Sequence, residues 1–213
     1  MTIRSFTFSP FETNTYVLSL PSGQVLLIDP ACWTEADSRL LGGYIDSLPG
    51  RKEQSGVTLV ATHGHLDHLF GAAWATRTYG TPVLMHPEDI PMATAMQAQY
   101  DLFGIDASPE PFPIAPLPQS GGSSILPLDK EWGGVSVLHT PGHTPGSVCF
   151  YFPEDGILFS GDTLFRMGYG RTDLPGGSFR RLMDSLDTLF SLSPGTRVYP
   201  GHGAPTTIAA EAR

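Results

Sequence analysis

Seven consecutive residues, Thr-His-Gly-His-Leu-Asp-His at positions 62–68, constrain the fold of this chain more than any other feature. They hold three imidazoles and one carboxylate, and they follow an apolar run at 57–61 that is typical of a buried strand. Neutral imidazole and carboxylate are the ligands that suit borderline divalent ions such as zinc, iron(II) and manganese. The sequence therefore predicts a metal site where this strand ends.

Three further ligands of the same type come from separate turns in the second half of the chain. Two histidines each lie in a Pro-Gly-His turn, and one aspartate follows the apolar run 157–160. Each comes after a predicted strand, and the carboxyl ends of strands are the common place for sites in open α/β architectures. The candidate ligands suffice for two metals that share one carboxylate. They are His63, His65, Asp67, His68, His143, Asp162 and His202.

The spacing within the first motif indicates how one segment can serve two ions. On extended backbone His63 and His65 point the same way, whereas Asp67 and His68 at the start of a helix diverge by about a hundred degrees.

Strand and helix patterns predict an α/β chain organised as one domain over residues 1–213. Alternating apolar runs flank Pro-Ser-Gly at 21–23 and predict a hairpin. Segment 88–130 is irregular and Pro-rich, which indicates either a lid or surface decoration. The predicted strands are 16–20, 24–28, 57–61, 135–138, 147–152, 157–160 and 196–199, and the predicted helices are 35–48, 69–79 with Gly80 as cap, 90–103 and 178–192.

Composition narrows the class of partner. The chain has no apolar stretch of about 18 residues and no signal-peptide core, so we expect a cytoplasmic protein without a membrane span. Its net charge of -9 argues against a nucleic-acid partner and favours a small molecule. The two cysteines, Cys32 and Cys149, are expected to be separate reduced thiols. Oligomeric state is not encoded in any of these patterns.

Three other residue types near the predicted strand ends have structural or functional interpretations. His86 and His139 are interpreted as structural or as supports for the ligands, and Cys32 as a buried inert thiol. Arg171 is a candidate for anchoring a substrate carboxylate, because a guanidinium presents paired donors. A structural pairing of Arg171 with Asp173 is an equal alternative.

The combined motifs resemble the metallo-β-lactamase superfamily, and within it the glyoxalase II-like hydrolases, also called hydroxyacylglutathione hydrolases. The resemblance rests on His-x-His-x-Asp-His at 63–68, Thr-Pro-Gly-His-Thr at 140–144, Gly-Asp-Thr-Leu-Phe at 161–165 and Pro-Gly-His-Gly at 200–203. It implies a four-layer αββα sandwich that binds two divalent metals, with zinc expected first and iron or manganese as alternatives. By this resemblance, His63, His65 and His143 hold one metal, Asp67, His68 and His202 hold the other, and Asp162 bridges them.

The resemblance also indicates where this chain departs from full-length glyoxalase II. Since the sequence ends at Arg213, we expect the C-terminal helical domain that helps to grip glutathione to be missing, and residues 168–177 look more like the short single-domain bacterial branch and the persulfide dioxygenases. Lactamases of the superfamily typically lack a bridging aspartate, so Asp162 speaks against lactam hydrolysis as the main activity.

These features predict hydrolysis of a small-molecule thioester such as S-lactoylglutathione. A hydroxide that bridges the metals would attack the carbonyl, with Asp67 or Asp162 managing the proton. A thiol departs without a strong general acid because its pKa is about 8.5. The alternatives are a persulfide dioxygenase with a single iron on His63, His143 and Asp162, another small ester, lactone or lactam hydrolase, and a non-catalytic metal-binding module.

Overall fold

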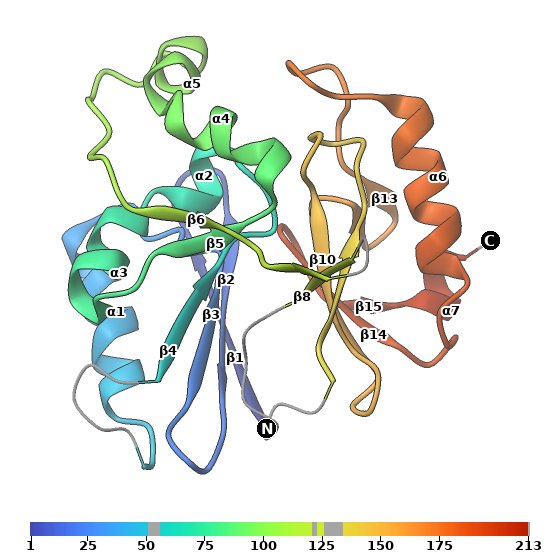
Figure 1. The fold of residues 1–213 in the computed structure, drawn as a ribbon, viewed down its shortest axis with the longest axis horizontal. Helices are drawn as coiled ribbons and strands as arrows, with labels where there is room; N and C mark the ends of the chain where they lie inside the picture. The colour runs from blue at the N-terminus through green and yellow to red at the C-terminus, as the bar shows by residue number, and fades with distance from the viewer. Residues whose placement is uncertain (51–55, 121–122, 126–133, 213) are drawn as a thin grey trace. The chain divides into compact units, whose positions relative to one another are not determined.

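The computed structural model describes residues 1–50, 56–120, 123–125 and 134–212 and divides the chain into two compact units (Figure 1). Unit 1 comprises Met1–Met85 and Ile90–Pro116, and unit 2 comprises His86–Asp89 and Leu117–Arg213. The organisation of residues 1–213 as one domain stays a prediction, as does a lid over 88–130, part of which lies outside the described residues.

Unit 1 is built on one sheet in which the strands follow chain order. The first three strands form an antiparallel meander, and the later ones pair in parallel. The strands are β1 (Thr2–Phe8), β2 (Thr13–Ser19), β3 (Val25–Ile28), β4 (Val57–Val60), β5 (Val83–Met85) and β6 (Ile114–Pro116). The β2–β3 pairing confirms the predicted hairpin. Strands β2 and β3 are buried along their whole length, so they form the centre of the core of unit 1.

Helices α1 (Glu35–Asp46) and α3 (Ala72–Tyr79) cover one face of this sheet (Figure 1). Thr34 begins α1 with a capping box, since its hydroxyl accepts from the amide of Asp37 and its own amide donates to the Asp37 carboxylate. Gly80 ends α3 at φ 66, which confirms the predicted cap.

The predicted helix 69–79 starts later than expected because a separate short helix, α2 (Leu66–Leu69), precedes it. Gly71 lies between the two helices and its amide donates to the carbonyl of Pro30 at 2.8 Å. A Cβ at Gly71 would lie 2.8 Å from the Cβ of Cys32, so this approach requires glycine. The contact that splits the helix is therefore tertiary.

The segment after residue 88 is more regular than predicted. The predicted helix 90–103 is present as α4 (Ile90–Thr94) and α5 (Met96–Leu102), with a break at Ala95. Strand β6 lies inside the Pro-rich stretch, for which no strand was predicted. It is an edge strand, which is the position that tolerates proline because one row of its backbone groups needs no partner.

Unit 2 is built on a second sheet in the order β15-β14-β11-β10-β9-β8-β7. Strands β11 and β14 pair in parallel, and the remaining neighbours are antiparallel. Its strands are β7 (Gln119–Ser120), β8 (Ser123–Ile125), β9 (Ser136–His139), β10 (Val148–Phe152), β11 (Ile157–Gly161), β14 (Arg197–Pro200) and β15 (Thr206–Thr207). A separate ribbon joins β12 (Leu164–Phe165) to β13 (Gly168–Tyr169). The predicted strands 135–138, 147–152, 157–160 and 196–199 are confirmed with small shifts of their ends.

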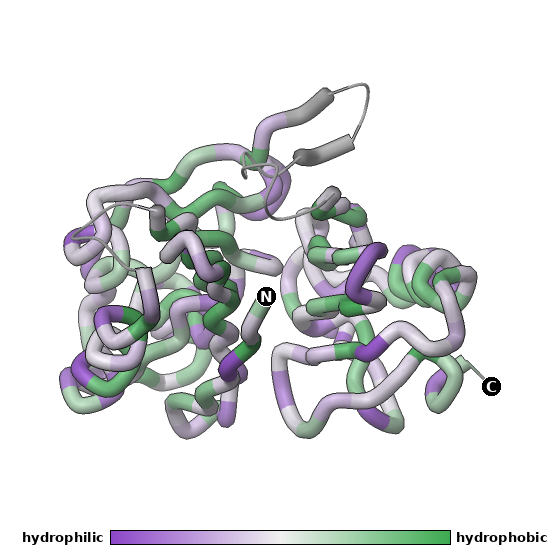
Figure 2. The backbone as a smooth tube through the Cα atoms, turned by 90° about the horizontal axis from the view of Figure 1, so that it is seen from below, coloured by the Kyte–Doolittle hydropathy of each residue, from purple (hydrophilic) through white to green (hydrophobic). Residues whose placement is uncertain are grey.

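Helix α6 (Phe179–Phe190) confirms the helix predicted at 178–192 and packs on this sheet. Its buried face carries Leu182, Leu186 and Leu189, and hydrophobic and hydrophilic stretches alternate along it in Figure 2. The unit also contains a 3-10 turn at Pro87–Asp89 and a short helix, α7 (Ile208–Glu211).

Two further expectations concern membranes and thiols. Within the described ranges, no helix has both the length and the apolar character needed to cross a bilayer. Cys32 and Cys149 are both free and buried, as expected of separate reduced thiols.

Candidate metal centre

Four of the predicted ligands lie together in unit 1, where β4 ends and α2 begins. His63, His65, Asp67 and His68, called here the histidine cluster, are all less than a tenth exposed. His63 Nε2 lies 3.1 Å from His65 Nδ1, and the ring centroids of His63 and His68 are 4.2 Å apart. Two nitrogens bonded to one tetrahedral zinc are separated by about 3.3 Å, so the first pair is spaced as ligands of a single ion would be.

A buried aspartate that the sequence analysis missed orders this cluster. Asp29 accepts hydrogen bonds from the Thr62 amide at 2.7 Å, from the Thr62 hydroxyl at 2.8 Å and from His68 Nδ1 at 2.9 Å. Since a carboxylate only accepts, the proton of His68 lies on Nδ1, and Nε2 is left to bind a metal. The available signal in the sequence is the Asp-Pro at positions 29–30, directly after the predicted strand 24–28.

Two further side chains support the backbone and the carboxylate of the cluster. The hydroxyl of Thr13 donates to Asp67 at 2.7 Å. Gln99 on α5 accepts from the amide of Leu66 and donates to the carbonyl of Gly64, each at 3.0 Å. These contacts fix the turn that connects the two halves of the motif.

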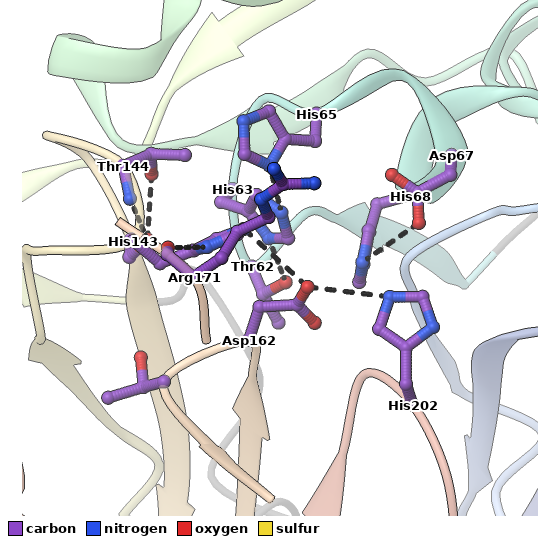
Figure 3. Close-up of polar contacts among 12 residues, drawn as sticks. Thr62, His63, His65, Asp67, His68, His143, Thr144, Asp162, Arg171 and His202 are labelled. Atoms are coloured by element: carbon purple, nitrogen blue, oxygen red, sulfur yellow. Dashed lines mark hydrogen bonds and ion pairs between the residues drawn. The ribbon is translucent and has the colours of Figure 1, made fainter. Parts of the chain in front are cut away.

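The other three predicted ligands lie together in unit 2, each after a different strand (Figure 3). His143 follows β9, Asp162 follows β11 and His202 follows β14; they are called here the strand-end trio. Asp162 Oδ2 lies 3.5 Å from His143 Nε2 and 3.4 Å from His202 Nε2. The carboxylate thus lies between the two imidazoles, as a shared ligand would.

The segment around Arg171 supports the trio through its backbone. His143 Nδ1 donates to the carbonyl oxygen of Arg171 at 2.7 Å, which leaves His143 Nε2 to face Asp162. A Cβ at Gly170 would lie 1.9 Å from the carbonyl oxygen of Asp162, so only glycine fits this approach. The side chain of Arg171 is exposed and binds Asp173 through two hydrogen bonds of 2.7 Å. Arg171 thus makes the structural pairing, and its role in substrate binding stays a prediction.

A second buried aspartate, also missed from the sequence, holds the turn that carries His143. Asp89 accepts from the hydroxyl of Thr144 and from the amide of Gly146, both at 2.6 Å. Thr144 is in turn hydrogen-bonded to Ser147. The turn between β9 and β10 is therefore fixed by a buried polar network.

The two cysteines have thiols of low reactivity. Burial raises the pKa of Cys32 to about 12 and that of Cys149 to about 11. A raised pKa removes the thiolate that would be needed for nucleophilic attack or metal binding. The interpretation of Cys32 as an inert thiol is supported.

A cavity of about 660 Å³ in unit 1 does not contain any of the predicted ligands. It is lined by α1, α3 and α5 with aromatic residues such as Trp33, Phe70 and Trp74. The size of a cavity therefore does not locate the metal ligands in this chain.

Comparison with known proteins bears on the fold and the family. Residues 9–202 match the family model of the metallo-beta-lactamase superfamily. The chain is 31% identical to the hydroxyacylglutathione hydrolase GloC of Haemophilus influenzae, over 100% of this chain and 96% of that protein.

Two solved structures are similar over nearly their whole length. TTHA1623 in a di-iron-bound form is 35% identical with a TM-score of 0.81, covering 99% of this chain and 97% of that one. The BLEG-1 B3 metallo-beta-lactamase is 30% identical with a TM-score of 0.81, covering 98% and 95%. These similarities confirm the predicted α/β fold. Each unit has a sheet with helices packed on it. A layer of strands and a layer of helices are the two kinds of layer in the αββα sandwich.

Proposed function

Because the chain belongs to the metallo-β-lactamase superfamily, we propose that the histidine cluster and the strand-end trio form one binuclear metal site. His63, His65 and His143 would hold the first metal, and Asp162 would be shared. The second metal would be held by Asp67, His68 and His202. This assignment requires the two units to bring the seven side chains together, and that arrangement is part of the proposal.

The side chains present fit divalent ions. All donors are imidazole nitrogens or carboxylate oxygens, which suit zinc, iron(II) and manganese. Asp29 and the carbonyl of Arg171 each hold one imidazole in the tautomer that a metal ligand needs. We propose zinc as the first metal to test, with iron next, since a similar protein is known in a di-iron-bound form.

The chain belongs to a class of metallo-hydrolases, and we propose thioester hydrolysis as its reaction. The observation that carries this proposal is the similarity to a hydroxyacylglutathione hydrolase over the whole chain, with every predicted ligand present. When bound, the metals would lower the pKa of a water and polarise the substrate carbonyl. Asp67 or Asp162 would take the proton of the attacking water.

A thiol leaving group is compatible with the residues of the histidine cluster and the strand-end trio, because its departure does not depend on a strong general acid among them. A thiolate leaves readily because the pKa of a thiol is about 8.5, so no separate strong acid is required. A small-molecule thioester is thus the proposed partner, and the cytoplasm the proposed location.

Kinetics with two thioesters test this proposal. We expect turnover of S-lactoylglutathione with a high Michaelis constant, and similar turnover when the glutathione portion is replaced by a simpler thiol. Activity should persist without dioxygen and with zinc or manganese in place of iron. The absence of thioesterase activity from fully metal-loaded protein would exclude the proposed reaction.

Lactam hydrolysis is a second candidate because BLEG-1, at 30% identity, is a B3 metallo-beta-lactamase. The shared position proposed for Asp162 favours the thioester. A cephalosporin assayed beside the thioester should therefore show the lower kcat/KM, and the reverse order would favour the lactam.

A persulfide dioxygenase with a single iron would use only His63, His143 and Asp162. Its oxygen uptake with glutathione persulfide would depend on iron and would survive Asp67→Ala and His68→Ala. We expect both substitutions instead to abolish most of the thioesterase activity. Oxygen uptake that survives them, without thioesterase activity, would establish the dioxygenase.

A further inference from the structure

Three potential ligands gather in unit 2 outside the proposed binuclear site. His86, Glu88 and His139 each offer one ligand atom, and these atoms lie within 4.8 Å of one another. His86 is buried, Glu88 lies in the following 3-10 turn, and His139 is the last residue of β9. The two rings stack with centroids 4.1 Å apart and an interplanar angle of 15°. The donor types are those of a borderline divalent ion.

Hydrogen bonds fix the tautomers of both imidazoles in the same sense. The amide of Glu88 donates to His86 Nδ1 at 3.3 Å, so that nitrogen carries no proton, and a bound ion would take its lone pair in place of this long hydrogen bond. His139 Nε2 donates to the carbonyl oxygen of Pro145 at 2.9 Å, which leaves its Nδ1 with a lone pair. Metal-ligating histidines commonly donate their other N–H to a carbonyl in this way. His143 uses the carbonyl of Arg171 similarly, so His139 is prepared as a ligand is.

The surroundings favour a neutral imidazole beside a cation. Burial, followed by the neighbouring His139, lowers the pKa of His86, and a ligating histidine must be neutral. The nearby carboxylates of Glu88 and Asp89 supply negative charge. Arg181 opposes a cation because it lies 3.8 Å from the Glu88 carboxylate. Its side chain is partly exposed, so solvent screens this repulsion.

The ligand atoms must move closer together to bind an ion. Ligands of a tetrahedral zinc are about 3.3 Å apart, so atoms that lie within 4.8 Å of one another need to approach by at most about 1.5 Å, and the His139 ring must turn out of the stack. Glu88 and His139 are both exposed, so their side chains can make this movement while buried His86 remains in place.

We propose that His86, Glu88 and His139 form a further divalent-cation site of the zinc class, with lower affinity than the binuclear site. A cation there would tie residues 86–88 to the end of β9. Asp89, the next residue, holds the turn that carries His143. An ion at this site would therefore stiffen that turn.

Zinc binding measured by equilibrium dialysis and elemental analysis tests this site. Wild-type protein should bind one zinc per chain more than His139→Asn at saturation, however many ions the seven predicted ligands hold. The result is a difference between two proteins, so it stands apart from the binuclear assignment. Glu88→Gln should weaken the additional site by about tenfold or more through the loss of a ligand, whereas Glu154→Gln, also an exposed glutamate, should not.

Imidazole nitrogen resonances give a second readout that does not depend on stoichiometry. The Nδ1 resonance of His139 should shift as zinc is added to the wild-type protein, and its melting temperature should rise more than that of His139→Asn. Equal zinc capacity in wild type and His139→Asn would overturn the proposal. So would equal zinc affinity in Glu88→Gln and Glu154→Gln, which also decides the question if His139→Asn does not fold.

Discussion

The histidine cluster and the strand-end trio provide similar ligands by different structural routes. The cluster takes four ligands from six residues after a single strand, whereas the trio takes three from the ends of β9, β11 and β14. The side chains of His68 and Asp67 in the cluster are 0% and 11% exposed, whereas the side chain of His202 in the trio is 27% exposed.

This difference shows where each set of ligands derives its geometry. The cluster depends on one turn, which Asp29 and Gln99 hold through buried or half-buried hydrogen bonds. The trio depends on the register of three strands and on the turn held by Asp89. We therefore expect a substitution in the histidine cluster to affect mainly that one turn. In the strand-end trio, where each ligand follows a different strand, we expect the effect on metal binding to differ from one ligand to another.

Replacement of the carboxylate between the imidazoles of the trio should have the largest effect. Asp162→Ala should lower the occupancy of both metals and reduce thioesterase activity by about 10³-fold or more, because water activation and oxyanion stabilisation both suffer. Elemental analysis and steady-state kinetics measure the two effects. Asp155→Ala, an exposed carboxylate in the same unit, is the control and should retain both metals. Full occupancy in Asp162→Ala would show that the carboxylate is not shared.

Loss of the most exposed ligand should affect one metal more than the other. His202→Ala should empty chiefly the second metal position and lower activity by about 10²-fold or more, because that metal would help to activate the water and to stabilise the oxyanion. Metal content and activity should be measured on the same sample. An equal loss of both metals would indicate that His202 organises the whole site, which contradicts the assignment.

The support of the cluster can be weakened without removing a ligand. Asp29→Asn should lower the affinity of the second metal by about 10- to 100-fold through the misorientation of His68. It should also lower the free energy of unfolding of the metal-free protein by about 1–3 kcal/mol, because one buried donor loses its acceptor. Chelator competition and denaturant titration measure these quantities. Asp46→Asn on the exposed side of α1 is the control, and matching values for the two variants would refute the role of Asp29.

The corresponding change in unit 2 should have the smallest effect. Asp89→Asn loosens the turn of His143 but leaves the hydrogen bond from His143 to the carbonyl of Arg171 intact. We expect the affinity of the first metal to fall by about tenfold, with little change at the second. Chelator competition at low zinc measures both. A larger loss than in Asp29→Asn would reverse the comparison between the two regions.

The proposed ligands could be located from the sequence because each lies in a motif that follows a β-type run or in a Pro-Gly turn. The residues that orient them could not. Asp29 bonds to Thr62, Gln99 to Gly64 and Asp89 to Thr144 across 33, 35 and 55 positions, and no local pattern encodes such contacts.

The fold shows the same limit. Strands with β-branched runs, such as β4, were predicted within a residue, because local composition specifies them. The division between α2 and α3 arises from the contact of Gly71 with Pro30 and Cys32, which is tertiary. Strand β6 consists of Ile-Ala-Pro and is specified by its pairing with β5 more than by its own residues.

The anomalous scattering of zinc in crystals of the metal-loaded protein tests the central claim most directly. The assignment predicts two peaks about 3.5–4 Å apart. One should be bound by His63, His65 and His143, and the other by Asp67, His68 and His202, with Asp162 in contact with both. A single peak on His63, His143 and Asp162, with no second metal at saturating zinc, would contradict the binuclear site.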